Sequence, residues 1–148
     1  MERLLTLLLI ASVLAIVDQY VKLELPTPMW ALHHRSEMWF VGSCMLLIAV
    51  MPLTRLPSNT VTAGAGIFAG GVLGNLVSAS ANDRDVQNPL VVGTHAGVAF
   101  NLADAFVLTG NIILMASLIA ITLRYRDQLD RQAVTNALKR TIRQRAEA

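Results

Sequence analysis

Four long apolar stretches constrain the fold of this chain more than any other feature of its sequence. A helix needs about 20 predominantly apolar residues to cross the hydrocarbon core of a bilayer. The stretches at 4–21, 38–53, 60–81 and 99–123 roughly meet this requirement. With 54% hydrophobic residues among 148, the chain is too apolar for an ordinary soluble domain and too short for two domains. The sequence therefore predicts an all-α integral membrane protein with four transmembrane helices in one domain, 1–123.

The basic residues outside these stretches predict the orientation of the helices. Lys and Arg are in excess on the cytoplasmic side of membrane proteins. Nine basic residues fall on one side and three on the other: Arg3, Arg55 and seven within 124–148, against Lys22, Arg35 and Arg84. We therefore expect both termini in the cytoplasm, and the loops 22–37 and 82–98 on the outer side.

Polar residues in the fourth stretch are the first candidates for a functional site, because a carboxylate that enters a membrane span is costly. At 3.6 residues per turn, Asn101, Asp104 and Asn111 fall within roughly 80° of one another. This stripe either forms hydrogen bonds with neighbouring helices or binds or cleaves a substrate. Both interpretations remain open at this point.

The first and third stretches carry a second set of candidates. Asp18 and Lys22 are four residues apart, so an ion pair along the helix is available, and Lys22 can also extend toward the membrane surface. On the third stretch, small residues at intervals of four allow close approach of a backbone, either within the bundle or from another protein. These residues are Gly66, Gly70 and Gly74, with Gly71 beside them. One face within about 100° holds Gly71, Gly74, Asn75 and Ser78.

Three motifs in the same order along the chain resemble the signal peptidase II family, membrane aspartic proteases that remove signal peptides from bacterial prolipoproteins. The F-N-L-A-D sequence at 100–104 resembles the motif of the family's fourth span, which supplies one catalytic aspartate, here Asp104. The family's G-G-x-L-G-N motif is matched at 70–75, and its D-Q-x-x-K motif at 18–22. The resemblance covers about residues 4–123, and it implies a multi-pass protein of the bacterial cytoplasmic (inner) membrane.

The chain departs from the family where the second catalytic aspartate is expected. The family follows G-N with two residues and then Asp-Arg, but this chain has Ser78 and Ala79 there. Aspartic protease chemistry needs two carboxylates that share a proton, and a lone aspartate cannot divide the two roles. A helix break after Ala79 would be needed for Asp83 to replace the missing group, and whether Asp83 or Asp85 does so stays open.

A second departure concerns the outer loop between the first two spans. The family carries a long segment there, with a small sheet and an N-x-G-A-A-F motif that cradles the substrate, whereas only 22–37 is available here. Pro26, Pro28 and the adjacent His33 and His34 favour an irregular connection. We therefore expect the substrate cradle to be absent.

Other chemical classes find little support in the sequence. Adjacent His33 and His34 point apart, and no Cys or carboxylate repeats at ligand spacing near them or near His95, so no metal site is expected. No cofactor-binding motif is present either. The single Cys44 excludes an intramolecular disulfide. The tail 124–148 has seven basic and three acidic residues and is predicted to be a weakly amphipathic cytoplasmic helix. Its surplus charge favours contact with anionic lipids rather than with nucleic acid, for which there is no motif.

Three functions follow from these observations. The first is a catalytically inactive, signal peptidase II-like accessory subunit or binding module. The second is an active prolipoprotein peptidase that uses Asp104 with a non-standard second group, and the third is a small transport or assembly helper. The expected partners are the lipid bilayer and either a membrane protein or a lipoprotein signal segment. The candidate binding residues are Asp18, Lys22, Asn75, Ser78, Asn101 and Asn111.

Overall fold

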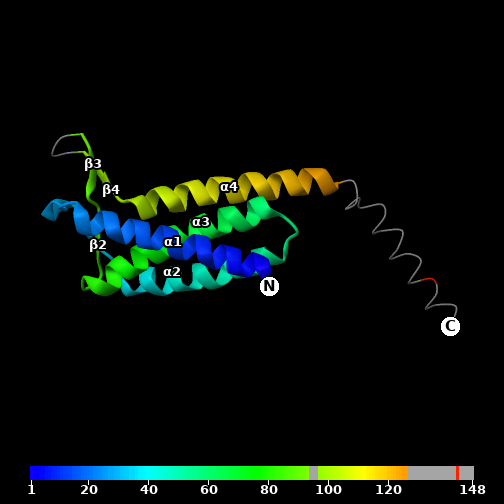
Figure 1. Cartoon of the computed structure of the whole chain (residues 1–148), viewed down its shortest axis with the longest axis horizontal. Coiled ribbons are helices and arrows are strands. Elements are labelled where there is room, and N and C mark those ends of the chain that lie inside the picture. The colour runs from blue at the N-terminus through cyan, green and yellow to red at the C-terminus, as the bar shows by residue number, and fades with distance from the viewer. Residues whose placement is uncertain (94–96, 127–142, 144–148) are drawn as a thin grey trace. The chain divides into compact units, whose positions relative to one another are not determined.

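Four long helices dominate the structure, a computed structural model that describes residues 1–93, 97–126 and 143. They are α1 (Glu2–Glu24), α2 (Glu37–Val50), α3 (Asn59–Ala81) and α4 (Leu102–Tyr125) (Figure 1). Together with the 3₁₀ helix η2 (Met51–Arg55) that extends α2, all four are long and apolar enough to cross a membrane. The predicted fold class, a mainly helical protein with four candidate spans, is confirmed.

The predicted span boundaries lie within about three residues of the observed helix ends, and two of the differences have a clear physical cause. The second span is not one α-helix to residue 53, because α2 ends at Val50 and Pro52 lies in η2. Proline lacks the N–H that an α-helix interior requires. The fourth helix begins at Leu102 rather than at residue 99, since Ala99 belongs to a strand and Asn101 precedes the first helical residue.

Serine side chains cap the N-termini of two of the helices. Ser36 Oγ accepts a hydrogen bond from Trp39 N at 3.2 Å at the start of α2. Ser58 Oγ accepts one from Val61 N at 3.3 Å at the start of α3. The first turn of a helix leaves N–H groups without intrahelical partners, and these caps satisfy one of them in each case.

The loops at one end of the bundle contain four strands of three residues each, which form two antiparallel pairs. The 3₁₀ helix η1 (Met29–Ala31) leads into β1 (Leu32–His34), which pairs antiparallel with β2 (Asp85–Gln87). A separate antiparallel pair consists of β3 (Leu90–Val92) and β4 (Val98–Phe100). The expectation of an irregular connection at 22–37 is therefore wrong. Strands this short contain too few alternating residues to be recognised from sequence.

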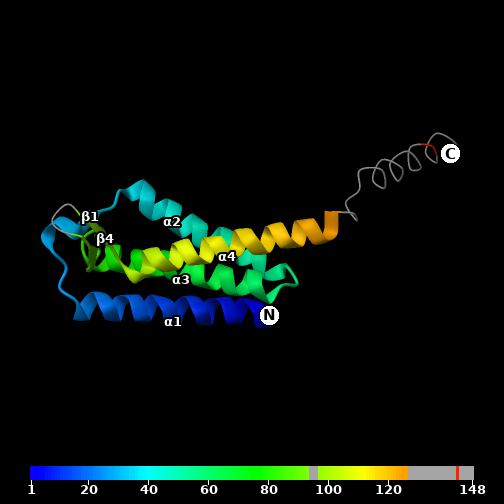
Figure 2. The ribbon, with the colours of Figure 1, turned by 90° about the horizontal axis from the view of Figure 1, so that it is seen from above.

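The helix α3 lies at the centre of the unit formed by Met1–Met115. In an apolar stretch of 18 residues from each helix, 67% of the residues are buried in α3, against 22% in α1 and 11% in α4. Figure 2 shows α3 between α1 on one side and α4 on the other. The strands lie at the end of these helices that is opposite to residue 1 (Figures 1 and 2).

Glycines on α3 allow its neighbours to approach closely. A Cβ on Gly70 would lie 2.9 Å from Leu14 Cβ of α1, and one on Gly66 would lie 2.9 Å from Ile10 Cβ. On another side of α3, a Cβ on Gly71 would meet the backbone of α4. Small residues thus let helices pack backbone to backbone, where larger side chains would hold them apart.

The second unit, Ala116–Ala148, contains the last part of α4 and the predicted tail. Within it, the Arg124 guanidinium lies 5.9 Å from the centre of the Tyr125 ring. Residues 127–142 and 144–148 lie outside the described part of the chain, so the amphipathic helix predicted for 124–148 stays a prediction.

Candidate functional site

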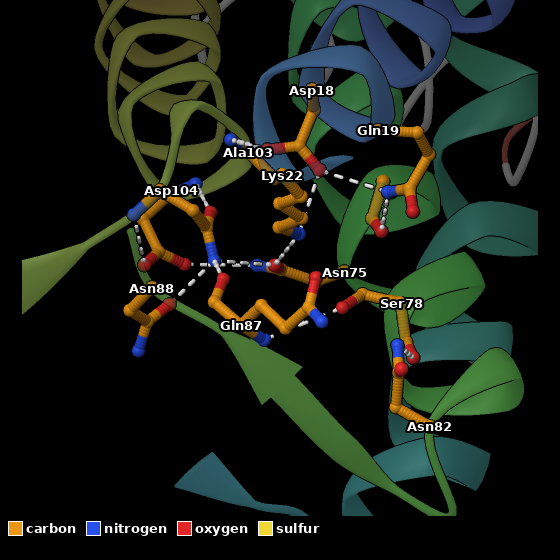
Figure 3. A network of polar contacts seen from close by, with 12 residues as sticks. Asp18, Gln19, Lys22, Asn75, Ser78, Asn82, Gln87, Asn88, Ala103 and Asp104 are labelled. Carbon is orange, nitrogen blue, oxygen red and sulfur yellow. Dashed lines mark hydrogen bonds and ion pairs between the residues drawn. The ribbon is translucent and has the colours of Figure 1, made fainter. Parts of the chain in front are cut away.

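A network of polar side chains joins α1, α3, α4 and the segment after α3 at the end of the bundle that carries the strands (Figure 3). We call it the polar network, and its members are Asp18, Gln19, Lys22, Asn75, Gln87, Asn88, Asn101 and Asp104. Five of the six candidate binding residues belong to this network or contact it, and Asn111 does not.

The buried ion pair between Asp18 and Lys22 anchors the network on α1. Lys22 Nζ lies 2.7 Å from Asp18 Oδ2, and the two side chains are 1% and 0% exposed. The i,i+4 spacing allows this contact, but the prediction that Lys22 extends toward the membrane surface is wrong. A buried charge is costly without a partner, and Asp18 and Asn75 hold the ammonium inside the bundle.

Asp18 also connects α1 to both neighbouring helices. Its Oδ1 accepts a hydrogen bond from Ala103 N of α4 at 2.8 Å. Its Oδ2 accepts one from Gln19 Nε2 at 3.0 Å, and the same nitrogen donates to Gly74 O of α3 at 2.8 Å. A Cβ on Gly74 would lie 2.8 Å from Asp18 Oδ2, so a glycine is needed where the carboxylate meets α3. Asp18 and Gln19 together therefore connect α1 to α3 and α4.

The Asn75 side chain links the ion pair to Asp104. Its Oδ1 accepts hydrogen bonds from Lys22 Nζ at 3.2 Å and from Asn101 Nδ2 at 3.0 Å. Its Nδ2 donates to Asp104 Oδ1 at 2.8 Å. The amide therefore presents its oxygen to the donors and its nitrogen to the carboxylate, which fixes its orientation.

Asn101 and Asp104 form a reciprocal cap at the start of α4. Asn101 Oδ1 accepts a hydrogen bond from Asp104 N at 2.8 Å, and Asp104 Oδ2 accepts one from Asn101 N at 3.4 Å. This is the arrangement of a capping box, and it also places a carboxylate in the first turn, where the helix dipole favours negative charge. Asp104 thus has a structural role that is independent of any chemistry. The N-x-x-D spacing of Asn101 and Asp104 is the sequence signal that could have indicated this cap.

Gln87 at the end of β2 and Asn88 directly after it close the network. Asn101 is fully buried, and its Nδ2 lies 3.1 Å from Gln87 O and 2.6 Å from Asn88 Oδ1. Asn88 Nδ2 in turn lies 2.9 Å from His33 Nδ1 on the adjacent strand β1. Gln87 and Asn88 could not be recognised as site residues from the sequence, because nothing in a loop sequence indicates that its residues will be buried.

Ser78 is the residue that the sequence resemblance aligns with the second catalytic aspartate of signal peptidase II. It is fully buried, and its Oγ accepts a hydrogen bond from Gln87 N at 3.4 Å. No hydrogen bond joins Ser78 to Asp104 in the described part of the chain. In Figure 3 the Ser78 side chain points toward Gln87, while Asp104 lies on the far side of Asn75. Ala79, where the family has arginine, is only 1% exposed.

Neither Asp83 nor Asp85 lies where the resemblance to signal peptidase II would place a second catalytic carboxylate. The helix α3 continues to Ala81, so the break after Ala79 that Asp83 would require does not occur. Asp83 is exposed in the turn that follows, with φ of +52°. Asp85 Oδ1 lies 2.9 Å from His34 Nδ1 at the surface.

Two further groups of candidate residues lie outside the polar network. Asn111 is exposed on α4, so the predicted stripe divides into a buried end at Asn101 and an exposed end. Gly66 and Gly70 face α1, as described above. Among the described residues, no group of three or more His, Cys, Asp or Glu side chains could hold a metal ion.

Comparisons with known proteins identify the fold but not a family. No protein-family model matches the sequence, and no curated protein matches it either. The structure is similar to that of a bacterial membrane enzyme determined by the in meso method at 2.3 Å resolution. That match has a TM-score of 0.63 and 18% sequence identity, and it covers 79% of this chain and 89% of the other. A second structure of a bacterial membrane enzyme, at 1.9 Å resolution, matches with a TM-score of 0.61 and 18% sequence identity. This match covers 76% of this chain and 92% of the other. The chain therefore has the fold of a membrane enzyme.

Proposed function

We propose that this chain, which shares the fold of a bacterial membrane enzyme, is a signal peptidase II-like protein that does not catalyse proteolysis. In this proposal it acts as an accessory subunit or binding module, and its polar network engages a membrane partner. The family comes from the three sequence motifs, and the fold similarity is compatible with it. The surroundings of Asp104 carry the argument against catalysis.

The hydrogen bonds of Asp104 do not suit an aspartic protease. Its two oxygens accept hydrogen bonds from neutral amide groups, Asn75 Nδ2 and Asn101 N. A catalytic pair needs a second carboxyl group close enough to share a proton with the first. The position expected to supply it holds Ser78, whose hydroxyl is of ordinary acidity and already accepts from Gln87 N.

Asp18 is the other carboxylate of the polar network, and its contacts fit a structural role. It is fully buried and accepts hydrogen bonds from Lys22, Gln19 and the backbone of Ala103. It donates none of these bonds, whereas one member of a catalytic pair must carry a proton that it can donate. A residue so enclosed also cannot reach a peptide bond in the described structure.

A binding role fits the same atoms. Asp104 is half-buried rather than enclosed, and the amides of Asn75 and Asn101 hold its carboxylate in one orientation. A carboxylate held in this way is prepared to accept a hydrogen bond from a ligand at little further cost in entropy. The segment at 85–88 covers one side of the network, so a ligand would meet Asp104 from its exposed side.

The test of catalysis is cleavage of a fluorescent prolipoprotein peptide by the purified full chain in lipid. We expect no cleavage by the native protein or by Asp104→Asn, while an authentic signal peptidase II cleaves the peptide alongside. Cleavage by the native protein that is lost in Asp104→Asn would contradict the proposal. The Ser78→Asp variant adds a further arm, and cleavage by it alone would show that only the second carboxylate is missing.

The test of binding is recovery of a partner from native membranes with the tagged full chain. We expect a partner to co-purify with the native protein and to be reduced by Asp104→Asn. Asp83→Asn is the matched control, because it removes a carboxylate charge of the same type from an exposed turn outside the polar network. Equal recovery with all three proteins would show that Asp104 does not contact the partner.

A further inference from the structure

An exposed amide near the middle of α4 has no partner within the described chain. Asn111 is exposed, and no hydrogen bond joins its side chain to any other described residue. It follows Leu102 by nine residues, which at 1.5 Å per residue places it about 14 Å along a helix about 36 Å long. The hydrocarbon core is about 30 Å thick, so the amide lies well inside it.

Asn111 differs in kind from the other exposed polar residues near the middle of the described helices. Those residues are Ser12 and Thr109, whose hydroxyls can bond to a carbonyl one turn back in their own helix. A primary amide has two donor hydrogens and an acceptor oxygen, which lipid tails cannot satisfy. Polar residues of this kind favour association of membrane helices.

The residues around Asn111 form a ridge suited to helix packing. Leu108 and Met115 lie three and four residues from Asn111 on the same side of the helix. Ile112 follows Asn111 directly and is four residues from Leu108, so all four residues fall within about 100° around the helix. They are 62%, 59% and 53% exposed, so nothing else in the described chain covers this surface. We call these four residues the Asn111 face. An apolar ridge with a single amide resembles the seam of a paired helix, in which a polar residue fixes the register.

Membrane geometry indicates which partner this face suits. Two copies of one chain inserted in the same orientation form a closed dimer only about an axis perpendicular to the bilayer. A residue on the contacting surface therefore meets its own counterpart at the same depth. An asparagine suits this position because the nitrogen of each amide can donate to the oxygen of the other.

We propose that the Asn111 face pairs with the same face of a second copy of this chain in the bilayer, with the two Asn111 side chains hydrogen-bonded across the two-fold axis. This contact is independent of the polar network and of the proposed function, because it lies on the exposed surface of α4. The partner is a second copy of the chain, and the contact holds the two α4 helices together.

The first test measures the dimer in lipid vesicles by energy transfer between full chains labelled at the C-terminus, over a range of protein-to-lipid ratios. We expect Asn111→Leu, which keeps an apolar side chain of similar size, to raise the dissociation constant about 3- to 30-fold. Ser12→Ala is the matched control, because it removes an exposed polar group from α1, and we expect it to leave the constant unchanged. Equal constants for the native protein and Asn111→Leu would overturn the proposal.

The second test locates the contact by disulfide cross-linking in a Cys44→Ser background. We expect Leu108→Cys and Met115→Cys to cross-link to their own counterparts, and Val13→Cys on the exposed side of α1 not to do so. Cross-linking that is as strong at Val13→Cys would overturn the assignment of the face. Native protein that stays monomeric at every ratio, while a different membrane protein is captured through Asn111, would overturn the proposal of a second copy.

Discussion

Replacement of Lys22 by methionine tests whether the buried ion pair holds the helices together. Methionine keeps the length and apolar stem of the side chain but removes the ammonium 2.7 Å from Asp18 Oδ2. Breaking a buried pair by removing one partner costs about 3 to 5 kcal/mol, because the remaining charge is uncompensated. Asp18 would keep its hydrogen bonds from Gln19 and Ala103 N, so we expect the lower end, about 3 kcal/mol.

The free energy of unfolding in mixed micelles, followed by tryptophan fluorescence, measures this cost. Arg84→Met is the matched control, because it removes a cation from the pair with Glu37, whose side chains are 44% and 83% exposed. Exposed pairs contribute about 0 to 1 kcal/mol. The double variant Asp18→Asn with Lys22→Met should be more stable than Lys22→Met by about 1 kcal/mol or more, because no charge is left buried. If Lys22→Met costs no more than Arg84→Met, the ion pair does not stabilise the bundle as argued.

Three further predictions test other parts of the structure by the same unfolding measurement. Gly71→Ala should cost about 1 to 3 kcal/mol, because its Cβ would meet the backbone of α4, whereas Gly42→Ala, with open space around it, should be neutral or slightly stabilising. Equal effects of these two would contradict the close approach of α3 and α4. Asn101→Ala should cost about 1 to 3 kcal/mol, since it removes the cap of α4 and leaves buried partners unsatisfied. If Asn101→Ala lowers the free energy of unfolding by no more than the surface substitution His34→Ala does, the cap does not stabilise α4. His34→Ala should change stability by less than about 1 kcal/mol, because its contact with Asp85 is exposed, and a larger loss would show that this contact supports the strands.

The polar network explains why the F-N-L-A-D sequence does not by itself indicate proteolysis. Asp104 and Asn101 cap α4, and both contact Asn75 of α3. These contacts serve the packing of the helices whether or not a second carboxylate is present. A chain that lost catalysis at Ser78 would still need Asp104 for its structure, so the motif can persist without the activity.

Much of the helical architecture could be predicted from the sequence, because apolar length is a local property. The four spans were placed within a few residues of α1, α2, α3 and α4. The approach of Asp18 to Lys22 followed from their spacing of four residues on one helix. The end of α2 at Val50 has a local cause in Pro52, although the predicted span ran on to residue 53 and its 3₁₀ end was not foreseen.

Contacts between segments that are far apart in the chain could not be predicted from the sequence. The strands β1 and β2 pair residues separated by about 50 positions, and each is too short to show alternation. The burial of Lys22 depended on Asn75, which α3 brings to within 3.2 Å of its ammonium. Gln87 and Asn88 gained their roles only because the chain after α3 folds back over Asn101.

By itself, the sequence determined the number of spans, the small-residue surface of α3 and the absence of a carboxylate at position 78, since each depends on residue type and local spacing. The tertiary structure alone decided which polar groups satisfy one another. It placed Asn101 and Asp104 in a cap joined to Asn75, and it left Asn111 exposed although the same stripe contains it. The physical reason is that the helical period fixes directions around one helix, whereas the packing of the other helices decides which of those directions is buried.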